Sequence, residues 1–163
     1  MASSSSAPPP PFILAPDESV AAPVTHIGHD RVVYKHLSEA FDVLELTIPP
    51  RSSPPMHLHE HQTETLHLLA GTLAIKSGNE GEERLIGAGT TLVLPPGCPH
   101  TYVNRTEQPA KLLAFICPGG SRSVTTFFRE AGTPEPEPID PSKIMQKAQD
   151  NGVIVVGPPL AAE

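Results

Sequence analysis

The chain has 163 residues, which suffices for one buried core and is too short for two barrels in tandem. Its formal net charge of −7 and its isoelectric point near 5.6 argue against nucleic acids and anionic membrane surfaces as partners, because both repel an acidic protein. Small molecules remain as the expected ligands.

A Ser/Pro-rich tract opens the chain, and we expect residues 1–23 to form a disordered or polyproline arm. The first 16 residues contain no lysine or arginine, so a signal or transit peptide is not expected. No apolar stretch approaches the length of a transmembrane helix. The two cysteines, Cys98 and Cys117, are expected to be reduced thiols, and a cytoplasmic location is therefore predicted.

Two strands are predicted next, over residues 31–36 and 41–48, and they belong to a barrel expected to span residues 24–120. In the second strand apolar residues alternate with polar ones, and two prolines end it. Glu45 lies on this strand, but the alternation does not say which face points inward. Glu45 is therefore only a weak candidate for a site residue.

The most informative segment follows, where His57 and His59 stand two positions apart. The two prolines shortly before them disfavour a helix, and residues i and i+2 of a β-strand point to the same side. In the next strand Glu64 shares a face with alternate apolar residues as far as Ala70. We expect Gly71 to turn this strand into a hairpin with residues 72–75.

A further segment supplies another histidine. Residues 77–83 are expected to form a solvated loop, and a tight turn over residues 95–97 then places His100 at the start of a strand. His100, Tyr102 and Asn104 share one face of that strand. An inward His100 completes a set of three imidazoles and one carboxylate, which is typical of an open site for one divalent ion.

At these residues the chain resembles the cupin superfamily, whose motifs read G(X)5HXH(X)3-4E(X)6G and G(X)5PXG(X)2H(X)3N. The first motif runs from His57 to Gly71, with Arg51 where its opening glycine belongs. The second motif is complete, and its residues are Gly89, Pro95, Gly97, His100 and Asn104.

The resemblance implies an all-β fold, a single cupin (jelly-roll) β-barrel with short C-terminal helices. A weaker likeness, over residues 127–130 and 152–159, is to small quercetin-dioxygenase-like cupins.

The same resemblance implies one divalent metal ion (iron, manganese, nickel, copper or zinc) held by His57, His59, Glu64 and His100. The expected function is a dioxygenase acting on a small aromatic, enolic or polyketide-like molecule. A redox-neutral isomerase, cyclase, dehydratase or decarboxylase is the alternative, and a cupin that binds small molecules without converting them is a second one. Glu64 is also a candidate general base, and Tyr102 is either a substrate-orienting residue or a core tyrosine.

The other histidines have weaker claims. His26, His29 and His36 match no pattern and are expected to be structural or exposed. His61 has the parity to shuttle protons at the pocket mouth, although an exposed turn histidine is the simpler interpretation, and His67 has the opposite parity and points away. Residues 57–61 also fit H-x-x-E-H, an inverted zinc-protease signature that needs a helix, which the preceding prolines oppose.

The C-terminal extension, residues 121–163, is expected to carry one or two short helices packed on the barrel or on a partner subunit. One helix is predicted within residues 121–130 from its apolar spacing. Asp140-Pro141 is typical of a second helix start, and Asn151-Gly152 of its end. A homodimer is the expected assembly.

Overall fold

The computed structural model describes residues 11–20, 23–78 and 80–163. Residues 1–10 and 21–22, which make up half of the predicted N-terminal arm, lie outside the described residues. The described part of the arm contacts the barrel, because the Val20 amide donates to the Tyr34 carbonyl at 2.8 Å. Across the described ranges, every helix is too short or too polar to cross a bilayer.

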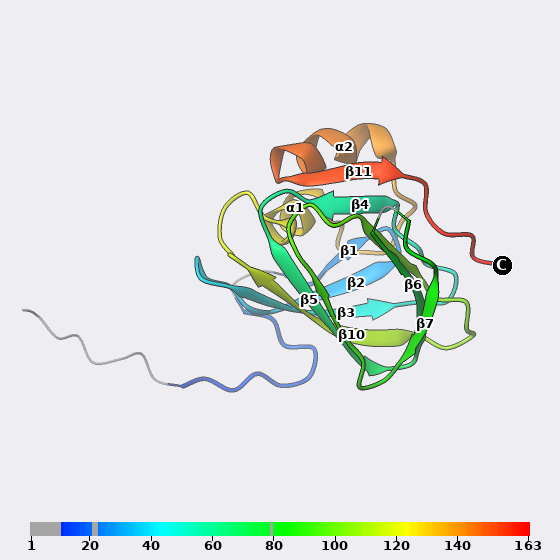
Figure 1. Ribbon diagram of the computed structural model, residues 1–163. Helices are drawn as coiled ribbons and strands as arrows, with labels where there is room; N and C mark the ends of the chain where they lie inside the picture. The colour runs from blue at the N-terminus through cyan, green and yellow to red at the C-terminus, as the bar shows by residue number, and fades with distance from the viewer. Residues whose placement is uncertain (1–10, 21–22, 79) are drawn as a thin grey trace, which may run out of the picture.

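Two antiparallel sheets face each other and enclose the core (Figure 1). The six-stranded sheet has the order β1 (Thr25–Ile27), β2 (Asp30–His36), β3 (Asp42–Ile48), β10 (Ala110–Cys117), β5 (Thr63–Ala70) and β8 (Thr91–Leu94). The five-stranded sheet has the order β11 (Val153–Gly157), β4 (Met56–His59), β9 (His100–Val103), β6 (Thr72–Ser77) and β7 (Arg84–Gly87). The expected all-β jelly-roll architecture is confirmed.

Alternation along the central strands of the larger sheet builds the core. On β3 the residues Leu44, Leu46 and Ile48 are buried, while the residues between them are partly exposed. Leu66 and Leu68 of β5 continue this inward face. Burying an aliphatic side chain of this size contributes roughly 1.5–3 kcal/mol, so the facing sheets are held together chiefly by these residues.

The prediction of a hairpin around Gly71 is wrong. Strands β5 and β6 lie in different sheets and do not pair with each other. Gly71 has a φ of +82°, and a Cβ atom placed on it would lie 2.8 Å from Cα of Ala110. The chain therefore turns tightly against β10 and crosses to the opposite sheet. A register shift opposite Lys111 also leaves Ala70 exposed instead of on the buried face.

Both C-terminal helices form where the sequence predicts them. Helix α1 (Val124–Ala131) begins after Ser123, whose hydroxyl accepts from the Thr126 amide, and it buries Val124 and Phe127. Helix α2 (Pro141–Asp150) begins after Asp140, which accepts from the Ser142 amide at 3.0 Å, and ends at Asn151. Both caps offset unpaired backbone donors of the first turn.

The extension also contains an element that the sequence did not suggest. Strand β11 pairs with β4 and thereby completes the five-stranded sheet, while α2 packs on β11 (Figure 1). The C-terminal segment is therefore part of the barrel wall as well as a helical cover. Its apolar run could not be distinguished from a tail by sequence, because such a short stretch carries little periodicity.

Candidate metal centre

Three imidazoles gather on the inner side of the five-stranded sheet. His57 and His59 lie on β4, and His100 lies directly opposite His57 on the neighbouring β9. One ring nitrogen from each of the three falls within 4.8 Å of the others. His59 and His100 are buried and His57 is half-buried, so the cluster is open on the side of His57.

A carboxylate reaches the cluster from the opposite sheet. Oε2 of Glu64, on β5, lies 3.2 Å from Nε2 of His59 and 3.0 Å from Nε2 of His100. The structure thus brings together all four residues that the sequence nominated as metal ligands. Their donor atoms come from three strands in two sheets, so closure of the barrel is what creates the cluster.

Backbone carbonyls fix the orientation of two rings. Nδ1 of His57 donates to the Pro55 carbonyl at 2.8 Å, and Nδ1 of His100 donates to the Cys98 carbonyl at 3.0 Å. Because a carbonyl only accepts, Nδ1 carries a proton in both rings. The inward Nε2 atom therefore offers a lone pair to a metal ion when the ring is neutral, whereas in the metal-free protein, against the effect of burial, the Glu64 carboxylate raises the pKa of His100 and favours a second proton there. This arrangement, with the outer nitrogen held by a carbonyl, is typical of metal-ligating histidines.

The ionisation of the cluster favours the binding of a cation. Burial and the neighbouring histidines His100 and His59 lower the pKa of His57 to about 3, so this ring is neutral. Burial alone would raise the pKa of Glu64, but the hydrogen bonds from His100 and His59 outweigh it and hold that pKa well below its usual range. A carboxylate that faces imidazole lone pairs is repelled unless a proton or metal ion lies between them. Three neutral imidazoles and one carboxylate fit a divalent transition metal.

Strand β4 is held on both sides, which keeps the histidines in place. On one side β11 pairs with it, setting Val155 opposite His57 and Val153 opposite His59. On the other side the Gly97 amide, from the tight turn before β9, donates to the His59 carbonyl at 2.8 Å. The Pro-Pro-Gly turn therefore both starts β9 and braces the first histidine strand.

A buried glutamine that the sequence did not single out secures the link from β4 to β5. The Gln62 side chain donates to the Pro118 carbonyl at 2.7 Å and accepts from the Val124 amide at 3.0 Å. Gln62 therefore ties the turn between His59 and Glu64 to the start of α1. Only the folded structure supplies both partners, which explains why no local pattern indicated it.

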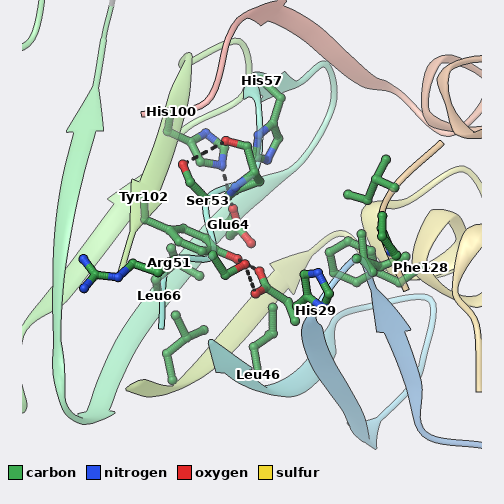
Figure 2. Close-up of a pocket in the computed structure, with 18 residues that line it drawn as sticks. His29, Leu46, Arg51, Ser53, His57, Glu64, Leu66, His100, Tyr102 and Phe128 are labelled. Atoms are coloured by element: carbon green, nitrogen blue, oxygen red, sulfur yellow. Dashed lines mark hydrogen bonds and ion pairs between the residues drawn. The ribbon is translucent and has the colours of Figure 1, made fainter. Parts of the chain in front are cut away.

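A cavity of about 280 Å³ opens beside the cluster (Figure 2). Both polar groups and apolar side chains line it, and the apolar ones come from the six-stranded sheet and the C-terminal segment. The polar lining residues include His29, Asp30, Ser52, Ser53, His57, Glu64, His100 and Tyr102, and the apolar ones include Ile27, Leu46, Leu66, Leu112, Phe128 and Ile139. An apolar pocket with a few convergent polar groups is typical of a small-molecule site.

Tyr102 and Asp30 form a second polar group in the lining of the cavity. Tyr102 lines the cavity, and its hydroxyl donates to Oδ2 of Asp30 at 2.7 Å. Figure 2 shows the Tyr102 ring extending from the strand of His100 toward His29. Burial raises the pKa of Asp30 to about 6, against the opposing effects of hydrogen bonds from Ser52 and Tyr102 and of nearby His29. Asp30 is 72 residues from Tyr102 in sequence, so no motif could have indicated it.

Of the other residues considered from the sequence, His61, His67 and Glu45 are outside the cavity lining, whereas His29 is part of it. His29, expected to be structural or exposed, lines the cavity. The His61 side chain is 66% exposed in a turn, and Nδ1 of His67 lies 2.8 Å from the Thr91 hydroxyl on the outer face. Glu45 pairs with Lys111 at 2.9 Å, also on the outer face.

Asn104, the last residue of the second motif, has a structural role. Its side-chain amide donates to the Ile48 carbonyl at 2.9 Å and to the Gln108 carbonyl at 2.8 Å. The inverted zinc-protease alternative is excluded, because residues 57–61 form strand and turn instead of the helix that this signature requires.

Comparison with known proteins identifies the fold family. The family model of the cupin domain matches residues 44–116, which contain all four residues of the cluster. No curated protein matches the chain.

Solved structures resemble the chain at low sequence identity. An uncharacterized conserved protein with a double-stranded β-helix domain from Klebsiella pneumoniae is 20% identical with a TM-score of 0.54, over 68% of this chain and 93% of that one. A predicted oxalate decarboxylase from Thermotoga maritima is 21% identical with a TM-score of 0.55, over 66% and 99%. A cupin-superfamily sugar phosphate isomerase from Silicibacter pomeroyi is 22% identical with a TM-score of 0.54, over 65% and 75%. At these identities the likeness establishes the fold alone.

Proposed function

Because the chain carries a cupin domain, we propose that it is a metal-dependent enzyme acting on a small enolic or enolisable molecule. The observation that supports this most strongly is the convergence of four ligand-type side chains at one end of a cavity. The cluster is open toward that cavity, since His57, Glu64 and His100 also line it. A ligand oxygen can therefore reach an ion held by the four residues.

The cavity favours small substrates. Its volume of about 280 Å³ lies just below the usual range of ligand pockets, roughly 300–1,000 Å³. A monocyclic aromatic, a short diketone or a hydroxyketone suits it better than a fused polycyclic molecule. Apolar walls formed by Leu46, Leu66 and Leu112 suit the carbon skeleton of such a molecule.

We propose dioxygenase chemistry as the first candidate reaction. A bound iron, manganese, nickel or copper ion supplies dioxygen activation, whereas zinc supplies Lewis acidity alone. In this proposal the enol oxygen of the substrate lies near His57, and the apolar lining residues exclude water from the cavity. Glu64 lines the same cavity and is a candidate proton acceptor, while Tyr102 orients the substrate.

A redox-neutral reaction is the second candidate, and one observation favours it. Asp30 is a buried carboxylate in the lining of the same cavity, a position from which a side chain can move a proton to or from a substrate. Isomerisation, dehydration or decarboxylation through an enolate needs such a group and no dioxygen. The two candidates therefore differ in whether dioxygen is consumed.

Metal analysis followed by activity assays tests the proposal. Purified protein is expected to contain one transition metal ion per chain. Oxygen uptake is then measured with 2,4-pentanedione and with a monocyclic hydroxypyrone, using His67→Ala as the matched control for His57→Ala. Uptake that the control retains and His57→Ala loses supports oxidation, and turnover under nitrogen supports the redox-neutral reaction.

A binding function without catalysis makes a different prediction. In that case fully metallated protein binds these compounds, measured by calorimetry, but converts neither in air nor under nitrogen. A protein that holds no metal after reconstitution with each of the five ions would contradict the proposed function altogether.

A further inference from the structure

Asp30 is a buried carboxylate that forms no ion pair with any described residue. The residue is 6% exposed, and none of the ion pairs among the described residues includes it. Its two oxygens are held by neutral donors, since the Ser52 hydroxyl donates to Oδ1 at 2.5 Å and the Tyr102 hydroxyl donates to Oδ2 at 2.7 Å. Burying such a group without a counter-ion costs several kcal/mol.

A purely structural role explains this arrangement poorly. Two hydroxyl donors can be satisfied by a neutral acceptor, which avoids most of the desolvation cost. Burial raises the pKa of Asp30 to about 6, despite the opposing effects of the hydrogen bonds from Ser52 and Tyr102 and of nearby His29. A carboxylate whose pKa lies close to neutrality, inside a cavity, is well suited to accept and return a proton.

The position of Asp30 complements the histidine cluster. Asp30 begins β2 in the six-stranded sheet, whereas all three histidines lie on the five-stranded sheet, and Asp30, His57 and His100 line one cavity. Each carboxylate oxygen has two lone pairs, and the two hydrogen bonds use only one on each. Asp30 therefore keeps a free lone pair on each oxygen for a substrate bound in the cavity.

We propose that Asp30 is the general base of this cavity and takes a proton from the carbon beside the substrate carbonyl. The inference rests on the proposed function, because the carbonyl oxygen must be held at the histidine end. As the carbon–hydrogen bond breaks, its electron pair forms the enolate and the proton passes to a carboxylate oxygen of Asp30. If a solvent deuteron replaces that proton on Asp30, its return to the same carbon gives exchange. Return to the adjacent carbon, with the hydroxyl proton of the enediolate passing to the former carbonyl oxygen, gives the isomer, and neither outcome requires an oxidant or a reductant.

Tyr102 and Ser52 are positioning residues in this scheme. They hold the carboxylate in one orientation through its two oxygens, and they do so from different parts of the fold, β9 and the segment before β4. Fixing the base in this way is how a buried carboxylate keeps a productive geometry.

Hydrogen–deuterium exchange of small α-hydroxyketones tests the proposal. The protein, with the metal that it carries on purification, is incubated under nitrogen in deuterium oxide with hydroxyacetone and dihydroxyacetone, and proton NMR follows loss of the α-proton signals. We expect wild-type protein to accelerate exchange over the same metal ion in buffer. Asp30→Asn should lose about a hundredfold or more of this acceleration, as removal of a general base does. Asp17→Asn, an exposed carboxylate paired with Arg31, is the matched control and should retain it.

Two results would overturn the inference. One is exchange at the wild-type rate in metallated, folded Asp30→Asn, and the other is metallated wild-type protein that exchanges neither compound. Should Asp30→Asn fail to fold, Asp30→Glu takes its place, because it keeps the charge but displaces the carboxylate; a tenfold or larger loss is expected, and an unchanged rate refutes the role of Asp30. Metal content is measured on every sample, so a wild-type protein without metal counts against the proposed function instead.

Discussion

Oε2 of Glu64 and Nε2 of His100 lie 3.0 Å apart although the two residues belong to opposite sheets of the barrel. The outer nitrogen of His100 donates to the Cys98 carbonyl, so its inner nitrogen carries a lone pair when the ring is neutral. A proton or a metal ion bound between the two atoms stabilises the carboxylate at that distance. Because the two atoms meet only when the two sheets close on each other, the folded barrel is required for cation binding at this place.

Removal of His100 should abolish metal binding. His100→Ala deletes a central donor and leaves Glu64 without its closer partner, so we expect the metal content after dialysis to fall from one ion per chain to less than about a tenth. The histidine His67, on the outer face, provides the control, and His67→Ala should retain full occupancy. Plasma emission spectrometry of the dialysed proteins measures both. Retention of the ion by His100→Ala would show that the site is built differently.

The stability of Asp30→Asn relative to wild type should depend on pH. The folded-state pKa of Asp30 is raised from 3.8 to about 6, so the protonated residue favours the folded protein at low pH, and this contribution is lost as the pH rises through about 6. Asparagine has no proton to lose, and the variant should therefore gain stability relative to wild type between pH 4 and pH 7.

The size of that gain follows from the shift. A change of two pKa units corresponds to about 3 kcal/mol at most. Urea denaturation of metal-free wild-type and Asp30→Asn protein at each pH measures the difference in the free energy of unfolding. A difference independent of pH would mean that Asp30 titrates normally.

Gly71 should tolerate no side chain. Gly71→Ala places a Cβ 2.8 Å from Cα of Ala110 and requires a residue with a side chain at a φ of +82°. We expect the free energy of unfolding to fall by about 1–3 kcal/mol. Gly87 is the control, because a Cβ there meets nothing within 4 Å, and Gly87→Ala should be neutral or slightly stabilising. Equal effects of the two substitutions would contradict the tight crossing between the two sheets.

Strand β11 should support metal binding from a distance. A chain ending after Gly152 exposes the edge of β4 and loses the buried Val153, which we expect to cost about 2 kcal/mol or more of stability. Because His57 and His59 lie on β4, the metal dissociation constant should rise at least tenfold. A chain ending after Pro159 keeps β11 and provides the comparison. Unchanged affinity in the shorter chain would show that β4 keeps its geometry alone.

The sequence was most informative where chemistry and geometry coincide. Histidines two apart in a strand point the same way, so the sequence alone placed His57 and His59 side by side. The start of the second helix at Asp140 was likewise predictable, because capping is local in the chain, whereas the first helix was predicted from its apolar spacing without its cap at Ser123.

What the sequence did not reveal depends on contacts between distant segments. The sequence around Gly71 is compatible both with a hairpin and with a crossing to the other sheet. Only the packing of Gly71 against Ala110 in the folded structure distinguishes the two. Asp30 carries no local pattern at all, since its role arises from Ser52 and Tyr102. The expected homodimer stays a prediction, which sedimentation of the purified protein would test.

The proposed chemistry requires that His57, His59, Glu64 and His100 together hold one metal ion. Anomalous diffraction from crystals of the purified protein, measured at the absorption edge of the metal found by emission spectrometry, locates that ion. We expect a single anomalous peak within about 2.0–2.2 Å of one nitrogen from each imidazole and one Glu64 oxygen. The absence of a peak there in metal-supplemented crystals, or a peak bound by other residues, would contradict this assignment.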